Sequence, residues 1–132
     1  MGARFSFRII TPEKDVTEET DFVRLRATDG DLGILKGHAP LVGALAVGEM
    51  DTGQADRRTK FAVAGGLILV NPESAILLST AAERRDEIDI ERAIRAKERA
   101  ASRLHQDDAD HIRAENALKR ALTRLEVGRG DR

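Results

Sequence analysis

The chain has 132 residues, of which 41% are hydrophobic and 34% charged, and its formal net charge is -1. This length suits one domain or two very small ones. The balanced charge argues against a nucleic-acid-binding protein held by phosphate contacts, so another protein is the expected partner. The chain contains no cysteine, which excludes disulfide bonds and thiolate metal sites.

The chain shows no sign of a targeting or membrane segment. Its first residues lack the apolar stretch of a secretory signal. No segment approaches the roughly 18 to 20 consecutive apolar residues that cross a bilayer. We therefore expect a cytosolic protein.

The first half of the chain has the pattern of short β-strands. Phe5, Phe7 and Ile9 alternate with other residues, which predicts a half-buried strand over residues 4–10. A second alternating run, residues 22–27, ends at Thr28-Asp29-Gly30-Asp31, a sequence typical of a hairpin turn. Glycines or Asn-Pro separate the further short apolar runs, which cover residues 41–47, 59–64, 67–70 and 75–79. This spacing predicts an antiparallel β-sandwich or barrel.

The most distinctive stretch of this half is GDLGILKGHAPL, residues 30–41. A phosphate-binding P-loop needs Gly-Lys-Ser/Thr at the start of a helix, but here Lys36 precedes Gly37 and Pro40 disfavours an early helix. The glycines are therefore expected to permit turns at strand ends, with His38 as an exposed or interface residue.

An enzymatic alternative also involves His38. In a small cytosolic enzyme with a β domain and a helical lid, His38 could act with Asp29 or Asp31 as acid and base. The chain offers such an enzyme no cysteine and no serine in a recognisable nucleophile motif. This alternative is the weaker one on the residues alone.

The second half has helical patterning instead. No glycine occurs between Gly66 and Gly128 and no proline after Pro72. Asp89 suits the N-cap of a first helix, whose apolar stripe comprises Ile90, Ala93, Ile94, Ala100, Ala101 and Leu104. After a turn at residues 105–108, a second helix ending at Val127-Gly128 is expected to bury Ile112, Ala114, Ala117, Leu118, Ala121, Leu122 and Leu125. The fold class is thus α+β, with a β-sandwich over residues 1–85 followed by a two-helix antiparallel hairpin over residues 86–132.

Arginines form a line of positive charge on each predicted helix. The first line comprises Arg92, Arg95, Arg99 and Arg103, and the second comprises Arg113, Arg120 and Arg124. Each pair of like charges at this spacing costs roughly 0.2 to 0.5 kcal/mol on an isolated helix. A solvated face relieved by nearby glutamates and a face that meets an anionic partner both remain open.

The predicted helical turn also holds residue types that bind metals. His105, Asp107, Asp108, Asp110 and His111 lie close together in the sequence. Turn and cap chemistry already accounts for the aspartates. We therefore predict no metal site.

Taken together, these features resemble the epsilon-subunit family of bacterial F-type ATP synthases. The resemblance spans almost the whole chain and rests on four signatures in order, namely residues 5–12, residues 30–41, Gly65-Gly66 and the hairpin rich in alanine and arginine. Two departures are visible: Lys36 stands where the family commonly has proline, and Leu67 where it commonly has phenylalanine. They affect only local loop geometry and packing.

The resemblance implies a noncatalytic rotor subunit without a cofactor. The sandwich would dock on the gamma subunit and the ring of c subunits, with Asp31, Gly33 and His38 at the subunit interface. The chain would thus lie at the cytoplasmic face of the bacterial plasma membrane, as a peripheral subunit that meets the membrane only through the complex. The hairpin would fold down on the sandwich or extend along gamma into the alpha/beta catalytic hexamer, where its basic residues inhibit ATP hydrolysis.

The resemblance also implies a regulatory ATP site. Some bacterial members bind ATP in the folded-down hairpin through the motif Ile/Leu-Asp-x-x-Arg-Ala, which Ile88, Asp89, Arg92 and Ala93 match here. By similarity, the adenine edge would be met by Glu83 and Asp89, and the phosphates by Arg92, Arg99, Arg120 and Arg124. A free-standing ATP sensor, which would need no gamma subunit, is an alternative.

Overall fold

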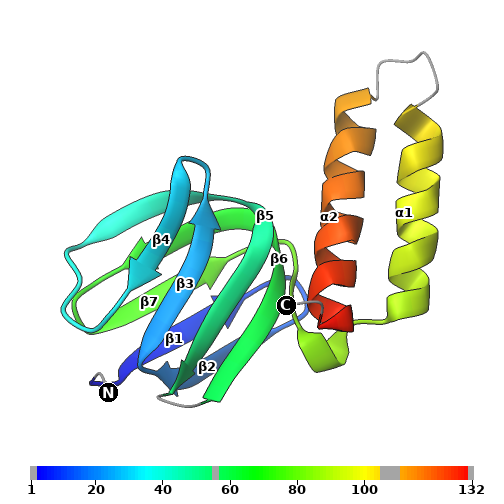
Figure 1. The fold of residues 1–132 in the computed structure, drawn as a ribbon. Helices are drawn as coiled ribbons and strands as arrows, with labels where there is room; N and C mark the ends of the chain where they lie inside the picture. Colours follow the sequence, from blue (N-terminus) through cyan, green and yellow to red (C-terminus); the bar gives the residue numbers. More distant parts are fainter. Residues whose placement is uncertain (1–2, 55–56, 105–110, 131–132) are drawn as a thin grey trace.

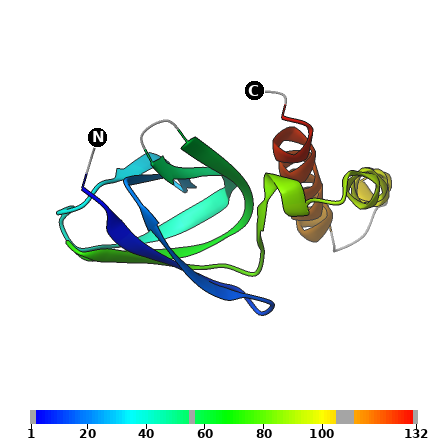
Figure 2. The ribbon, with the colours of Figure 1, turned by 90° about the horizontal axis from the view of Figure 1, so that it is seen from below.

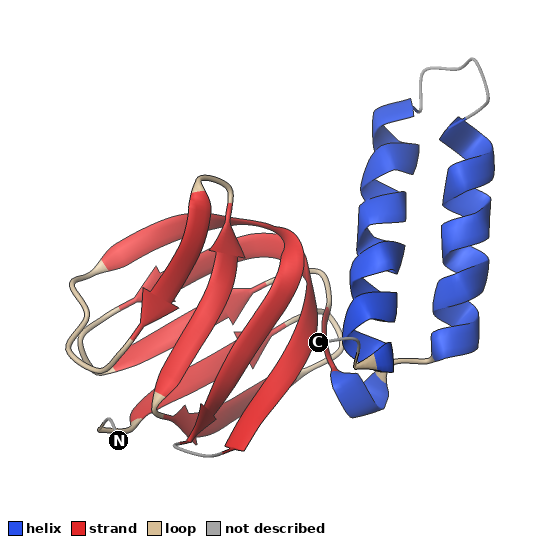
Figure 3. Cartoon of the chain, viewed as in Figure 1, coloured by secondary structure: helices blue, strands red, loops and turns tan. Residues whose placement is uncertain are grey.

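The computed structural model describes residues 3–54, 57–104 and 111–130. Strands fill the first part of the chain: β1 (Phe5–Ile10), β2 (Asp15–Thr20), β3 (Phe22–Ala27), β4 (Gly30–Ile34), β5 (Leu41–Gln54), β6 (Arg57–Val70), β7 (Ser74–Leu78) and β8 (Ala82–Arg84). A short 3-10 helix, η1 (Arg85–Glu87), leads to the helices α1 (Ile90–Leu104) and α2 (His111–Arg129) (Figure 1). Strands and helices occupy separate parts of the molecule (Figure 3). This arrangement confirms the predicted α+β class, a sandwich followed by a helical hairpin.

The strands form one curled sheet in the order β2-β1-β7-β6-β5-β3-β4, with β8 paired to β6. Among the described strand pairs, all are antiparallel except β1 with β7, which is parallel. Phe5, Phe7 and Ile9 of β1 are all buried, as their alternation predicts. They join a core that also contains Val23, Leu25, Ile34, Met50, Phe61, Ile68 and Leu77.

Two strands are longer than the sequence predicts. β5 continues through Gly48, and β6 continues through Gly65 and Gly66, where separate short runs were expected. Gly65 and Gly66 have φ values of 85° and 125°, and a Cβ on Gly66 would lie 2.0 Å from the Leu78 carbonyl oxygen. These glycines therefore mark a bend and a close approach of the neighbouring strand, not strand ends.

The hairpin lies beside the sandwich with α2 inward and α1 outward (Figure 2). Asp89 is the N-cap of α1, as predicted, because its Oδ1 accepts the Arg92 N–H at 3.1 Å. Among the described residues, no helix combines the length and apolar character needed to cross a membrane.

The expected buried face of α2 needs correction. Ile112 and Leu122 are 75% and 43% exposed, although the sequence pattern assigned both to the core. Ala114, Ala121 and Leu125 are buried as expected, while Thr123 and Val127 are buried without having been predicted. The reason is that α2 packs on two sides, against α1 and against the sandwich, so its buried surface is not a single stripe.

The predicted end of α2 is also wrong. The helix continues through Gly128 to Arg129. Gly130 then adopts a φ of 66° and its N–H donates to the Val127 carbonyl oxygen at 3.2 Å. Gly128 is instead a packing position, since a Cβ there would lie 2.5 Å from Ile90 Cδ1.

Candidate functional site

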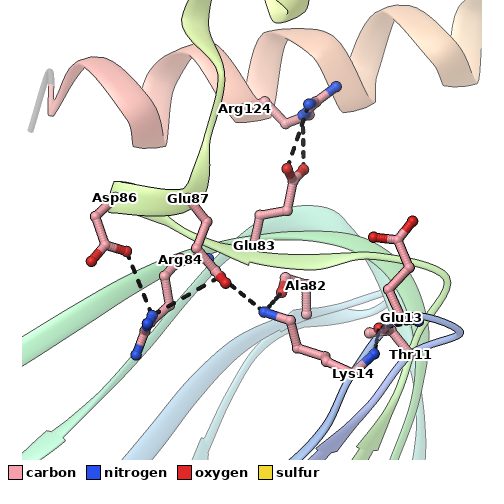
Figure 4. Close-up of polar contacts among 9 residues, drawn as sticks. All are labelled: Thr11, Glu13, Lys14, Ala82, Glu83, Arg84, Asp86, Glu87 and Arg124. Atoms are coloured by element: carbon pink, nitrogen blue, oxygen red, sulfur yellow. Dashed lines mark hydrogen bonds and ion pairs between the residues drawn. The ribbon is translucent and has the colours of Figure 1, made fainter.

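An ion pair joins the sandwich to the hairpin. Glu83 of β8 places Oε1 2.8 Å from Arg124 Nε, and Arg124 Nη2 donates to Glu83 Oε2 at 3.5 Å. Figure 4 shows the two side chains pointing toward one another from β8 and α2. The side chains are only 29% and 21% exposed, so this contact lies within the interface between the two parts of the chain.

A small hollow surrounds this ion pair. It has a volume of about 130 Å³, and we call it the interdomain hollow. Its sandwich wall is formed by Ala62, Val63, Ala64, Ala81 and Glu83, and its helical wall by Arg120, Thr123 and Arg124. The hollow thus combines small apolar side chains with one carboxylate and two guanidinium groups.

A second hollow lies between the two helices. It has a volume of about 230 Å³, and we call it the interhelical hollow. Arg99 and Arg103 of α1 and Arg120 and Arg124 of α2 surround a floor of Ala96, Ala100, Ala117 and Ala121. The alanines leave room between the helices, and the arginines supply the charge. Because Arg120 and Arg124 line both hollows, the two adjoin one another.

The structure brings together four of the residues assigned to the nucleotide site. Glu83, Arg99, Arg120 and Arg124 line the two hollows. Asp89 and Arg92 line neither hollow. Asp89 precedes α1 and caps it with its carboxylate, and Arg92 lies in the first turn of the helix.

The two apolar residues of the predicted motif take part in packing. Ala93 is buried in α1, and Ile88 is half-buried, with its Cγ2 near the position that a Cβ on Gly128 would occupy. Both therefore contribute to packing within the hairpin and its connection to the sandwich.

Sequence reasoning missed some residues of the two hollows. Arg103 was recognised only as part of a charged line, although its spacing of four from Arg99 places both on one helix face. The alanines of β6 and Ala81 carry no signal of their own, because their role depends on which helix packs over them. Local patterns cannot predict that contact.

The arrangement suits the binding of an anion. The two hollows together present four guanidinium groups, which form strong paired hydrogen bonds with phosphate oxygens, and one carboxylate. Within the described residues, no three histidine, aspartate or glutamate side chains are placed to hold a metal ion. The cluster at residues 105–110 lies outside the described residues.

The turn between β1 and β2 provides a neighbouring electrostatic contact. Lys14 Nζ lies 2.9 Å from Glu87 Oε1, between the sandwich and η1. The hydrogen bond from Lys14, supported by the Arg84 N–H, lowers the pKa of the Glu87 carboxyl below its ordinary value. Glu87 is thus held in its charged form.

The predicted subunit-interface residues lie elsewhere. Asp31 and Gly33 are exposed on β4, which is an edge strand of the sheet, and His38 is half-buried in the loop that follows. His38 Nδ1 lies 2.7 Å from the Ala39 carbonyl oxygen, and Asp31 Oδ1 lies 3.7 Å from Arg26 Nε. These contacts engage His38 and Asp31 with other groups and give the acid–base alternative no support.

Comparison with known families covers nearly the whole chain. Residues 4–85 match the family model described as ATP synthase, Delta/Epsilon chain, beta-sandwich domain. Residues 86–128 match the model described as ATP synthase, Delta/Epsilon chain, long alpha-helix domain. The order of the two matches is the order of sandwich and hairpin in the structure.

Similar solved structures have the same fold. A chain in the Euglena gracilis mitochondrial ATP synthase superposes with a TM-score of 0.80 at 24% identity, covering 96% of this chain and 81% of that one. A chain from the central stalk and c-ring of the Tetrahymena thermophila mitochondrial ATP synthase gives a TM-score of 0.63 at 12% identity, covering 98% and 97%.

Curated relatives are closer in sequence. The ATP synthase epsilon chain of Desulforamulus reducens is 47% identical over 122 residues, which cover 90% of this chain and 92% of the relative. The ATP synthase epsilon chain of Bacillus pumilus is 43% identical, with the same coverage of 90% and 92%. The chain therefore belongs to the ATP synthase epsilon-chain family, whose members are noncatalytic subunits of that complex.

Proposed function

We propose that this chain is a central-stalk subunit whose hairpin senses ATP. In this proposal, ATP binds across the two hollows and stabilises the hairpin against the sandwich, which withholds it from the catalytic subunits. When the hairpin is released, it extends along the gamma subunit into the alpha/beta hexamer and inhibits ATP hydrolysis. The chain itself carries out no reaction.

The observation that carries the proposal is the wall shared by the two hollows. Arg120 and Arg124 line both, so one ligand can contact them from either side. On the interhelical side, Arg99 and Arg103 add two more guanidinium groups. This cationic half suits a chain of phosphates, since each guanidinium can donate two hydrogen bonds to one phosphate group.

The interdomain hollow suits the other end of the ligand. Its volume of about 130 Å³ is small beside ligand pockets, so it would take a base and not a whole nucleotide. Ala62, Ala64 and Ala81 supply an apolar surface for a flat ring. The Glu83 carboxylate could accept a hydrogen bond from the exocyclic amine of adenine.

The location of this hollow links binding to regulation. Its walls come from both the sandwich and α2, so undocking the hairpin separates them. A ligand that needs both walls has a higher affinity for the docked state and shifts the population toward it. Asp89 and Arg92 line neither hollow here and are assigned to the site by the resemblance alone.

In the released hairpin, the arginines of α1 would meet protein partners. Arg92, Arg95, Arg99 and Arg103 are all exposed on the outer helix and could meet acidic surfaces of the catalytic subunits. The sandwich would remain on the gamma subunit and the c-ring through the region of Asp31, Gly33 and His38. The complex would place the chain at the cytoplasmic face of the plasma membrane.

Calorimetric titration of the full chain with ATP tests the proposal. Arg120→Ala removes a guanidinium that lines both hollows, and we expect it to weaken binding about tenfold or more. Arg92→Ala is expected to weaken binding as well. Arg113→Ala is the matched control, because Arg113 is exposed on α2, lines neither hollow and, unlike Arg92, is not assigned to the site by the resemblance. The affinity of this variant for ATP should be unchanged.

Ligand fragments separate the two halves of the site. Inorganic tripolyphosphate should bind less tightly than ATP and lose affinity in the Arg120→Ala variant. The affinity for adenosine should depend on Glu83 but not on Arg99. Undetectable binding of ATP at millimolar concentration would overturn the nucleotide-sensing proposal and leave the arginines as contacts for acidic subunits.

A further inference from the structure

One side chain fastens the connection between sandwich and hairpin. Lys14 lies between β1 and β2, and its Nζ donates to the Ala82 carbonyl oxygen at 2.8 Å and to Glu87 Oε1 at 2.9 Å. Figure 4 shows Lys14 reaching from its turn to both groups. We call this pair of contacts the Lys14 strap. It joins the β1–β2 turn to the segment that leads into α1.

The turn that carries Lys14 is itself well defined. Thr11 Oγ1 accepts hydrogen bonds from the backbone N–H groups of Glu13 and Lys14 at 3.2 and 3.1 Å. The Thr11 N–H donates to the Lys14 carbonyl oxygen at 2.8 Å, and Pro12 restricts φ between them. The lysine is therefore presented from a fixed backbone, which reduces the entropy lost in forming the strap.

The receiving groups bracket a short segment of chain. Ala82 directly precedes Glu83, and Glu87 ends η1. Glu87 Oε1 also accepts the N–H of Arg84, the residue before η1, at 2.8 Å, so the carboxylate closes this short helical turn as well. Residues 82–84 are already held on the sandwich by the pairing of β8 with β6. The strap's own contribution is therefore to hold η1, which carries Glu87, against the sandwich.

The fixed segment defines where the hairpin is free to turn. After Glu87, Ile88 is extended, with φ -80° and ψ 124°, and α1 begins at Ile90. Movement of the hairpin about Ile88 and Asp89 would leave the strap intact. Movement about residues 84–86 would break it.

We propose that Lys14 is a positioning residue for the regulatory hairpin: it holds η1, residues 85–87, against the sandwich and places the hinge after Glu87. The use of this hinge rests on the proposed function, because only a hairpin that undocks needs one. The strap itself requires no nucleotide, so it can be tested separately.

Hydrogen–deuterium exchange of the full chain without nucleotide provides the test. Lys14→Met keeps the aliphatic stem and removes the ammonium, and we expect the amides of residues 84–88 to exchange about five- to tenfold faster. Lys14→Arg retains the charge and two donors and should restore most of the protection. In Lys14→Met the pKa of the Glu87 carboxyl should also move closer to its ordinary value, which reports loss of the ammonium–carboxylate contact itself.

The matched control lies in the β1–β2 strand pair, whose turn carries Lys14. Arg8 forms a two-point ion pair with Asp15, at 2.8 and 2.7 Å, without contacting the segment. Arg8→Met should therefore leave the amide exchange of residues 84–88 unchanged. Unchanged exchange in Lys14→Met, an equal increase in Arg8→Met, or no rescue by Lys14→Arg would overturn the strap.

A second variant tests the position of the hinge. Val127 is fully buried and shares a helix face with Thr123, which lines the interdomain hollow, so Val127→Asp should undock α2. Residues 84–88 should stay protected from exchange in this variant and lose protection when Lys14→Met is combined with it. Loss of protection in Val127→Asp alone would overturn the hinge position. Failure of ATP binding would instead overturn only the nucleotide-sensing proposal.

Discussion

The Glu83 carboxylate and the Arg124 guanidinium, with Oε1 and Nε 2.8 Å apart, form an ion pair between the last strand of the sandwich and the second helix of the hairpin. Arg124 also lines the interhelical hollow, so a single guanidinium contacts the sandwich, the hairpin seam and the proposed ligand site. The pair therefore links the position of the hairpin to the state of that site.

We expect this pair to stabilise the docked hairpin without ligand. In a double-mutant cycle with Glu83→Gln and Arg124→Met, the coupling in the free energy of unfolding should be about 0.5 to 1.5 kcal/mol, because both side chains are mostly shielded from solvent. Urea denaturation measures it. The exposed Arg8–Asp15 pair serves as the control, with an expected coupling of only about a few tenths of a kcal/mol. Equal coupling in the two cycles would show that the interface adds nothing to the pair.

Gly128 should tolerate alanine better than a branched side chain. A Cβ there would lie 2.5 Å from Ile90 Cδ1 and 3.1 Å from Ile88 Cγ2. In Gly128→Ala, the roughly 1 kcal/mol gain in helix propensity offsets part of that crowding. Gly128→Val should lose about 1 to 3 kcal/mol of unfolding free energy, as overpacked positions do.

Thermal or urea unfolding of both variants checks this prediction. Asn116→Val is the matched control, since Asn116 is exposed on the same helix. A Gly128→Val variant as stable as the control would mean that the ends of the hairpin are not closely packed.

Local patterns predicted those parts of the fold that depend on local physics. The alternation of Phe5, Phe7 and Ile9 and the cap at Asp89 are both confirmed. β2 was missed because its sequence, DVTEET, is mostly polar and forms an exposed edge strand. A sheet edge can form without the apolar signal by which strands are recognised.

The errors involve contacts between distant segments. Gly66 was interpreted as a separator between strands, but it makes room for Leu78 of β7. Gly128 was interpreted as a helix end, but it makes room for Ile90, and Gly130 has the left-handed conformation of a helix terminus. A glycine needed for packing cannot be distinguished from a glycine needed for a turn without knowing what approaches it.

The sequence also indicated part of the geometry of the two hollows. The arginine spacing on each helix indicated a cationic surface, and the resemblance identified which arginines to consider. Neither indicated that Arg120 and Arg124 would line two hollows at once, because this depends on how α2 docks on β6. The alanine surface opposite them is likewise a product of the tertiary structure.

Asp51 should make the sandwich sensitive to acid. Its side chain is 1% exposed, hydrogen-bonded to Arg24 and 3.1 Å from Lys60 Nζ. Burial raises the pKa of Asp51, but the hydrogen bonds from Arg24 and Lys60 outweigh burial and lower the pKa overall. A carboxyl with a lowered folded-state pKa stabilises the fold above its unfolded pKa of about 3.9, and this contribution is lost as the pH falls from there toward the folded value.

Unfolding free energies measured between pH 7 and pH 2.5 test this sign. Asp51→Asn should be less stable at pH 7 by about 1 to 3 kcal/mol, because two cations lose their charged acceptor. The difference from the parent chain should shrink as the pH falls below about 4. A constant difference across this range would contradict the assignment of the ionised form to Asp51. Asp15→Asn, at an exposed ion pair, is the control.

Gly33 offers a way to test the proposed subunit interface without disturbing the fold. It is exposed on the edge strand β4, and a Cβ built there meets no atom within 4 Å. Its φ lies outside the left-handed region, so Gly33→Leu should leave the unfolding free energy of the isolated chain unchanged within about 0.5 kcal/mol.

A side chain projecting from this edge should instead obstruct a subunit that packs against it. We expect Gly33→Leu to reduce copurification with the gamma subunit and the c-ring, whereas Thr17→Leu, exposed on the opposite edge strand β2, should not. Normal assembly of the Gly33→Leu chain would exclude this edge from the interface, and equal loss in both variants would indicate a general effect of an added apolar side chain.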